Sequence, residues 1–106
     1  KYGYIFRQMF SVLYEEAAEE DLRALHALEA RRILDEVDAQ LTREPMKPTR
    51  RRKLLKGLLP PWDSARPVWQ LRLGDLRVFY DIDEARREVI IRAVRRKGTK
   101  STEEIL

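Results

Sequence analysis

The clearest pattern of apolar and polar positions lies in VWQLRLGDLRVFYDID, residues 68–83. The two kinds of residue alternate, break at Gly74-Asp75, and alternate again. A two-residue loop that begins with glycine is a favoured connection for a tight hairpin, so the pattern predicts strands over 68–73 and 76–82. Counting outward from the turn predicts five opposed pairs. They are Leu73 with Leu76, Arg72 with Arg77, Leu71 with Val78, Gln70 with Phe79, and Trp69 with Tyr80.

Successive side chains of a strand point to opposite faces, so this hairpin has one apolar face and one mixed face. The apolar face holds Trp69, Leu71, Leu73, Leu76, Val78, Tyr80 and Ile82. The mixed, open face holds Gln70, Arg72, Arg77 and Phe79. A further strand over 88–95 adds Val89, Ile91 and Ala93 to the apolar face, and Ile90, Arg92 and Val94 to the open face. This register places Arg92 opposite Phe79, with Arg95, Arg96 and Lys97 at and beyond the end of the strand.

The rest of the chain supplies one more strand and a helical hairpin. Residues 9–14 alternate as a strand, and residues 15–41 contain no glycine or proline and are helical. A single helix of this length would span about 40 Å, too long for so small a domain, so two antiparallel helices with a break near 26–30 are expected. Their apolar stripe is Leu22, Leu25, Leu28, Ile33, Leu34, Val37 and Leu41. Residues 50–58 form either an edge strand or a basic loop, and 60–67 form a turn. The sequence therefore predicts an α+β fold with the helical hairpin packed on one face of a small antiparallel sheet.

Length and composition limit the kinds of function. The chain has 106 residues, no cysteine and one histidine, His26, which argues for one domain without disulfide, thiolate or histidine-based metal sites. His26 is therefore interpreted as structural. No apolar run is long enough to span a membrane, and the start of the chain does not match a signal peptide. Met9 is a candidate natural start, which makes residues 1–8 an extension and 9–106 the domain.

Charge is divided unevenly along the chain. Residues 1–44 contain 6 Lys or Arg against 10 Asp or Glu, whereas residues 45–106 contain 16 against 8. The second half includes a basic run at Arg50, Arg51, Arg52 and Lys53, followed by Lys56. The run is either a solvated surface or a contact for a phosphate backbone. The division as a whole favours a polyanionic partner for the second half.

The opposition of Arg72 and Arg77 has two interpretations. Like charges directly opposite one another destabilise a sheet, so something is expected to neutralise them. One interpretation is a carboxylate of the chain itself; the candidates are Asp75, Asp81, Glu103 and Glu104. The other is a phosphate-binding groove, in which arginine supplies a planar fork of donors and Phe79 a surface for base stacking. Trp62, in the proline-rich loop, is interpreted as a core residue rather than a stacking surface.

The segment KLLKGLLPPWDSARPVWQLRLGDLRVFYDID, followed by EVIIRAVRRKG, resembles the RelE/ParE family of type II toxin–antitoxin toxins. The family pattern is a leucine–glycine segment, a hairpin with Trp-x-Leu-Arg-x-Gly-Asp-x-Arg-x-x-Tyr, and a hydrophobic strand that ends in basic residues. The resemblance covers nearly everything from Met9 onward. It implies a cytoplasmic toxin that needs no cofactor and is neutralised by a cognate antitoxin. That antitoxin would be acidic and partly disordered when free, and would form a hetero-oligomer with the toxin.

The resemblance also implies an activity and a site. RelE-like members cut mRNA in the ribosomal A site, with the RNA 2′-hydroxyl as nucleophile and basic residues around the scissile phosphate. By position, Arg72, Arg77 and Lys97 correspond to these catalytic residues, with Arg95 or Arg96 as neighbours that could take the place of Lys97. The nucleic-acid contacts would come from Arg50, Arg51, Arg52, Lys53, Lys56, Phe79, Arg92, Arg95 and Arg96.

Two features depart from the nuclease pattern. Gln70 stands where the best-known nucleases have lysine, and the C-terminal segment GTKSTEEIL lacks the aromatic residue of many active members. Three functions therefore stay open: an mRNA endoribonuclease, a ParE-like poison of DNA gyrase without nuclease activity, and a non-catalytic RNA-binding regulatory module.

Overall fold

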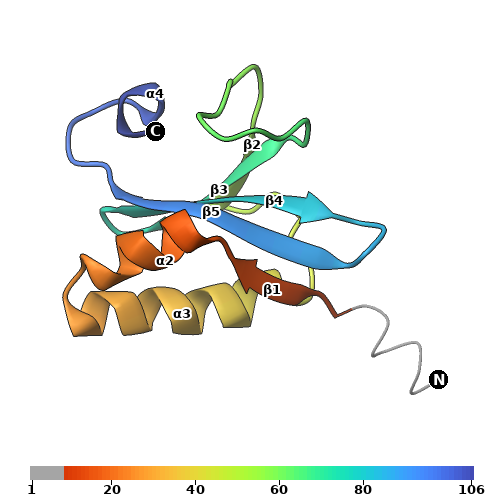
Figure 1. Cartoon of the computed structure of the whole chain (residues 1–106), viewed down its shortest axis with the longest axis horizontal. Helices are drawn as coiled ribbons and strands as arrows, with labels where there is room; N and C mark the ends of the chain where they lie inside the picture. Colours follow the sequence, from red (N-terminus) through yellow and green to blue (C-terminus); the bar gives the residue numbers. More distant parts are fainter. Residues whose placement is uncertain (1–8) are drawn as a thin grey trace.

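Five strands form one sheet in the order β1-β5-β4-β3-β2 in the computed structural model, which describes residues 9–106 (Figure 1). The elements are β1 (Ser11–Tyr14), α2 (Glu16–Arg23), α3 (Ala27–Leu41), β2 (Arg52–Leu55), β3 (Val68–Leu73), β4 (Leu76–Asp83), β5 (Glu88–Arg96) and α4 (Thr102–Ile105). The predicted α+β fold is confirmed, and the basic segment 50–58 contains an edge strand. β1 differs from the rest because it pairs with β5 in parallel, whereas the other pairs are antiparallel. The proposed extension, residues 1–8, lies outside the described residues.

The β3–β4 hairpin has the register that the sequence predicts. All five expected pairs are present, including Arg72 opposite Arg77 and Gln70 opposite Phe79. Gly74 has a φ of 60°, in the left-handed region that glycine adopts without a steric penalty, which suits the first position of this turn. The turn residues thus fix which side chains of the two strands meet.

The predicted faces of β5 are correct up to Ile91 and wrong for Ala93 and Val94. A register shift separates two neighbouring pairs, Phe79 with Ala93 and Tyr80 with Ile91. Arg92 is the extra residue between them, so it does not lie opposite Phe79. The shift reverses the sides, and Val94 joins the core beneath the helices while Ala93 joins the cluster on the other face.

Helices α2 and α3 cover one face of the sheet. Ala18 from α2 and Ile33, Val37 and Leu41 from α3 are buried against the apolar face of the hairpin. The helices meet at the predicted break, where α3 begins directly after the exposed His26. Two members of the predicted apolar stripe are not core residues: Leu28 is 86% exposed and Leu34 is 41% exposed. Within residues 9–106, no helix is long and apolar enough to cross a membrane.

The other face of the sheet is partly covered, contrary to the open face that the alternation predicted. Val68, Phe79, Ala93 and Ile105 form a second buried cluster, against which Leu55, Leu58, Trp62 and Leu106 pack. Ile105 comes from α4, a short helix that begins with a capping box between Ser101 and Glu104. The interpretation of Trp62 as a core residue is confirmed. The part of this face near the hairpin turn and β2 remains accessible, because Arg72 and Lys53 are exposed there.

Candidate functional site

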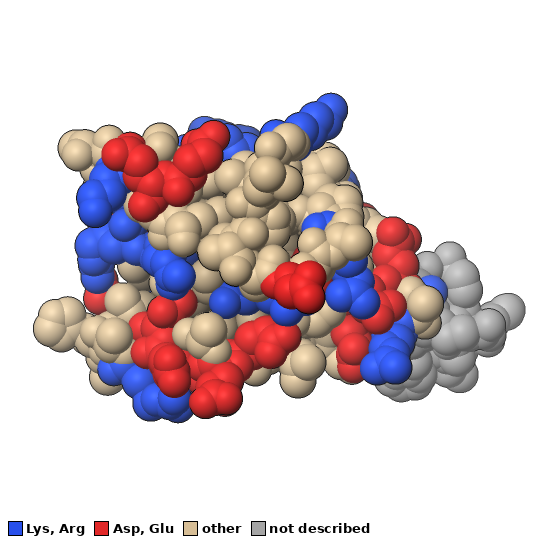
Figure 2. All heavy atoms as spheres, turned by 45° about the horizontal axis from the view of Figure 1, so that its top comes forward, with Lys and Arg blue, Asp and Glu red and all other residues tan. Residues whose placement is uncertain are grey.

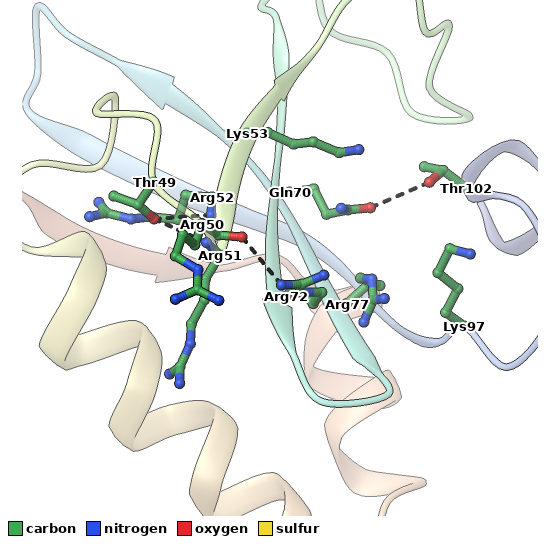
Figure 3. Close-up of a pocket in the computed structure, with 10 residues that line it drawn as sticks. All are labelled: Thr49, Arg50, Arg51, Arg52, Lys53, Gln70, Arg72, Arg77, Lys97 and Thr102. Atoms are coloured by element: carbon green, nitrogen blue, oxygen red, sulfur yellow. Dashed lines mark hydrogen bonds between the residues drawn. The ribbon is translucent and has the colours of Figure 1, made fainter.

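A hollow of about 370 Å³ lies where β2, the β3–β4 hairpin and the segment after β5 meet (Figure 3). Its lining residues are Thr49, Arg50, Arg51, Arg52, Lys53, Gln70, Arg72, Arg77, Lys97 and Thr102. We call this hollow the basic pocket. It brings together the three residues predicted to be catalytic, Arg72, Arg77 and Lys97, and four of the predicted nucleic-acid contacts. None of the described residues that line it is acidic.

The opposed arginines of the hairpin have no carboxylate partner. None of the ion pairs within residues 9–106 includes Arg72 or Arg77. None of the four carboxylates proposed to neutralise them forms an ion pair with either arginine. Asp75 lies beside Arg96 and Asp81 pairs with Arg92, while Glu104 caps α4 and the exposed Glu103 forms no ion pair in the described chain. Asp75 offsets part of the cost of the like-charge pair, because its charge acts on Arg77 without forming an ion pair.

Arg77 is held in place by the hairpin itself. Its Nη1 donates to the carbonyl oxygens of Gly74 at 2.7 Å and Leu76 at 2.9 Å, while its buried Nε has no partner in the structure. Burial, and then the charge of Arg72, lower the pKa of Arg77, and Asp75 opposes this change. Arg72 is exposed and makes one long bond, from Nη2 to the carbonyl oxygen of Arg50 at 3.5 Å. An oxyanion in the pocket would meet two guanidinium groups, one of them fixed.

Lys97 and the basic run border the rest of the pocket. The Nζ atom of Lys97 donates to the carbonyl oxygen of Lys100 at 2.6 Å. Arg50, Arg51 and Lys53 are exposed, and Arg51 has only a distant carboxylate neighbour, Glu36, at 3.9 Å. Lys56 lines an adjoining hollow of about 290 Å³ that shares Lys53 and Thr102 with the basic pocket. These cations are available to a polyanion.

Four of the residues predicted to contact nucleic acid instead make hydrogen bonds or ion pairs within the chain. Arg52 is 9% exposed and donates to the carbonyl oxygens of Gln40 and Glu44, where it holds the end of α3. Arg92 pairs with Asp81 and Glu15 at 2.8 Å each, Arg95 pairs with Asp21, and Arg96 pairs with Glu29 at 2.9 Å. The charges of Arg92, Arg95 and Arg96 are compensated by these carboxylates. Arg95 and Arg96 therefore do not take the place of Lys97, because Lys97 lines the pocket and they do not.

The predicted stacking role of Phe79 is wrong. Its side chain is 0% exposed and belongs to the second buried cluster. The sequence places Phe79 on the correct face, but α4 and the loop of Trp62 cover that face. A buried ring cannot stack on a base without local opening of this cluster.

Three neutral residues, Thr49, Gln70 and Thr102, complete the pocket. Gln70 is buried, and its Oε1 accepts from the hydroxyl of Thr102 at 3.5 Å, as Figure 3 shows. Thr49 and Thr102 were not predicted as site residues, because only the return of the C-terminal segment over the sheet brings Thr102 to the pocket. Within residues 9–106, no cluster of three metal-ligating side chains is present. The pocket can thus bind and orient an anion, but its described lining lacks a carboxylate or imidazole to accept a proton.

The surface charge follows the division along the sequence. In Figure 2 acidic side chains gather in the lower part of the view, over the region of α2, whose first turn contains Glu16 and Glu19. The basic pocket instead lies between elements of the second half. The acidic side chains of α2 therefore do not line the basic pocket.

Comparison with known proteins decides the family. Residues 12–99 match the sequence profile described as ParE toxin of type II toxin-antitoxin system, parDE. The chain belongs to the ParE toxin family. No curated protein sequence gives a significant match.

Solved structures support this ParE assignment through the fold. The toxin–antitoxin complex RelBE2 from Mycobacterium tuberculosis contains a chain that is 25% identical, with a TM-score of 0.68, over 83% of this chain and 91% of that one. The archaeal RelE–RelB complex from Pyrococcus horikoshii OT3 has a chain that is 23% identical, with a TM-score of 0.67, over 86% and 98%. The isolated E. coli RelE toxin is 16% identical, with a TM-score of 0.60, over 88% of each chain. This ParE-family chain is therefore the toxin of a type II toxin–antitoxin system, with the fold of RelE toxins.

Proposed function

We propose that this toxin cleaves mRNA in the ribosomal A site, with the scissile phosphate bound in the basic pocket. The observation that carries the proposal is the opposition of Arg72 and Arg77 in a pocket without carboxylates. An arrangement that destabilises the free protein becomes favourable when an anion enters. A phosphate diester fits the two guanidinium forks, which supply paired donors at fixed angles.

The proposed reaction requires the protein mainly to position the RNA and to stabilise negative charge on the phosphate. The 2′-oxygen of the RNA attacks the adjacent phosphorus, and the bond from phosphorus to the 5′-oxygen breaks. The products are a 2′,3′-cyclic phosphate and a free 5′-hydroxyl. The 2′-hydroxyl loses one proton, and the leaving 5′-oxygen gains one. Arg72 and Arg77 would bind the non-bridging oxygens as negative charge grows on them, which is commonly a large contribution to catalysis.

Lys97 completes this assignment from the side of the C-terminal segment. Its ammonium group has three donors and faces the same hollow as the two arginines (Figure 3). In the free protein one of these donors binds the carbonyl oxygen of Lys100. Lys97 would turn from that carbonyl to the leaving oxygen or to a non-bridging oxygen when the phosphate binds.

Proton transfer is the weak part of this site. Gln70 occupies the floor of the pocket, and an amide side chain neither accepts nor donates a proton at neutral pH. A positioned general base contributes about 10²–10⁴-fold in rate, so this toxin should cleave more slowly than a relative that has one. Water or the phosphate itself would take the proton from the 2′-hydroxyl.

The lack of a proton acceptor in the described lining favours one alternative, a ParE-like poison of DNA gyrase without nuclease activity. Such a protein needs the scaffold and a partner surface, and it does not need a proton acceptor beside the phosphate. The match to the ParE profile also agrees with this alternative.

The proposed partner is an acidic antitoxin that is partly disordered when free. Solved relatives of the same fold are complexes of RelE with RelB. An acidic segment would satisfy the unpaired cations of the basic pocket and would gain affinity from opposite charge. Because the proposed substrate is translated mRNA, we place the toxin in the cytoplasm with the ribosome and the antitoxin.

Primer extension on mRNA from cells that express the toxin tests the proposal. Cuts in translated mRNA should appear with the wild type and disappear with Arg77→Ala. Arg86→Ala is the matched control, because Arg86 is an exposed arginine of the β4–β5 turn away from the pocket. Intact mRNA together with relaxed or broken DNA would instead support gyrase poisoning.

A further inference from the structure

The turn of the β3–β4 hairpin contacts the segment that follows β5. The carbonyl oxygen of Asp75 accepts from the amide of Lys97 at 2.9 Å, and its carboxylate Oδ1 accepts from the amide of Gly98 at 2.9 Å. The other carboxylate oxygen of Asp75 lies 3.8 Å from Nη1 of Arg96. One residue of the turn therefore contacts three consecutive residues around Lys97.

These contacts hold the chain directly after the last residue pair of the sheet. The last β4–β5 pair is Leu76 with Arg96, so Lys97 lies just outside the ladder. Gly98 has a φ of 56°, a left-handed conformation that turns the chain away directly after Lys97. Without the two bonds to Asp75, the backbone of Lys97 would keep only its local bond within the turn, from the amide of Lys100 at 3.1 Å.

Asp75 acts from outside the pocket. It is not among the residues that line the hollow, whereas Lys97, Arg72 and Arg77 all are. Its carboxylate contacts Gly98 and Arg96, and within the described chain it forms no ion pair with either of the two opposed arginines. An acidic residue can thus lie on the turn between two catalytic arginines without filling the anion site.

We infer that Asp75 is a positioning residue that fixes the backbone on both sides of Lys97 and thereby keeps the Lys97 ammonium at the basic pocket. This inference rests on the proposed function of the pocket. Lys97 has a long, flexible side chain, and its reach into the pocket depends on where its backbone is held. A displacement of about 1 Å in a catalytic constellation can cost about 100-fold in rate.

The two side-chain contacts of Asp75, with Gly98 and with Arg96, can be separated by substitution. Asp75→Asn keeps the backbone carbonyl and a side-chain oxygen that accepts from Gly98, and removes only the charge. Asp75→Ala removes the side-chain acceptor and leaves the Gly98 amide without it. Asp63→Ala is the matched control, because Asp63 is an exposed aspartate in the loop before β3 and forms no ion pair within the described chain.

Single-turnover cleavage of mRNA on programmed ribosomes measures the effect, with thermal unfolding as a check that each variant is folded. Asp75→Ala should lower the rate by about 10- to 100-fold with little change in affinity for an mRNA that carries a 2′-deoxy nucleotide at the cleavage site. Asp75→Asn should stay within a few-fold of the wild type. Because Asp75 acts through Lys97, Asp75→Ala should have no further effect in a Lys97→Ala background.

Two results would overturn the inference. One is wild-type cleavage by Asp75→Ala, and the other is an equal loss in the presence and absence of Lys97. Hydrogen exchange of the Lys97 and Gly98 amides gives a readout that is independent of cleavage, and it should speed up in Asp75→Ala. If the wild type cuts no mRNA, the proposed function fails, whereas unchanged exchange at these two amides would reject the positioning role itself.

Discussion

Replacing Arg72 by glutamine should stabilise the free toxin while it weakens anion binding. Arg72 lies opposite Arg77 in the hairpin and is not part of an ion pair in the described chain. The one hydrogen bond of its side chain is long, 3.5 Å to the carbonyl oxygen of Arg50, and lies on an exposed surface. The substitution therefore removes a repulsion and loses little else.

The size of the gain follows from this geometry. Opposed pairs on a sheet contribute about 0.2–1 kcal/mol, and like charges contribute with the unfavourable sign. For a domain of this size, about 1 kcal/mol corresponds to a rise in Tm of about 4–8 °C. Glutamine keeps a polar side chain and removes the charge, although it is shorter than arginine. The gain should be largest at low salt, because the Debye length shrinks to about 10 Å at 0.1 M salt.

Urea denaturation at low and high salt measures the effect, with Arg96→Gln as the matched control. Arg96 is at the same end of the sheet, but it pairs with Glu29 through two bonds of 2.9 Å, so its removal should not stabilise the protein. Inorganic phosphate should stabilise the wild type more than Arg72→Gln, because a ligand stabilises the state that binds it. If Arg72→Gln is less stable than the wild type at low salt, the interpretation of the pair as an uncompensated charge is incorrect.

Three further predictions concern the core, the proton acceptor and pH. Phe79→Ala should lower the free energy of unfolding by about 3–5 kcal/mol, measured by urea denaturation, because the ring is fully buried; a stable variant that merely binds RNA more weakly would restore the stacking role. Gln70→Lys should raise the rate of mRNA cleavage by at least about 10-fold, because a group that can transfer a proton then enters the pocket; an unchanged rate in a folded variant would show that proton transfer does not limit this toxin. Burial raises the pKa of Tyr80 above its usual value of 10.0, although Arg52 opposes the shift, and the hydroxyl donates to the carbonyl oxygen of Pro45 at 2.8 Å. Since the folded state holds this proton more tightly, its contribution to stability is complete below pH 10 and falls as pH rises, by up to about 1.4 kcal/mol per pH unit. Tyr80→Phe should flatten that fall, which denaturation between pH 9 and 11 would detect, and an identical slope would contradict the assignment.

The sequence was most informative where local rules determine the structure. The turn at Gly74-Asp75 sets the register of the hairpin, so the opposition of Arg72 and Arg77 follows from counting residues. The helical hairpin also follows from the spacing of apolar residues, because two short helices can bury a stripe that one long helix could not place on this domain.

The rest depends on tertiary contacts that residue spacing does not reveal. The extra residue at Arg92 reverses the faces of β5, and no glycine or proline marks it. Its position is explained by Asp81 and Glu15, which pair with Arg92 from distant parts of the chain. Phe79 was misjudged and Thr102 was missed, because α4 returns across the sheet, covers Phe79 and brings Thr102 to the pocket. The sequence does not reveal α4, because a helix of four residues is too short for a periodic pattern. The sequence therefore predicts which cations line the pocket, whereas the structure shows which basic residues form ion pairs within the described chain and which do not.

The most direct test of the account is an analysis of the ends that the purified toxin leaves on mRNA bound to ribosomes. If the basic pocket is a nuclease site, the fragments end in a 2′,3′-cyclic phosphate, and no cleavage occurs when the nucleotide at the cut carries a 2′-deoxyribose. Fragments from the 2′-deoxy mRNA, or intact mRNA with a toxin that still arrests growth, would contradict the assignment of the basic pocket as a nuclease site.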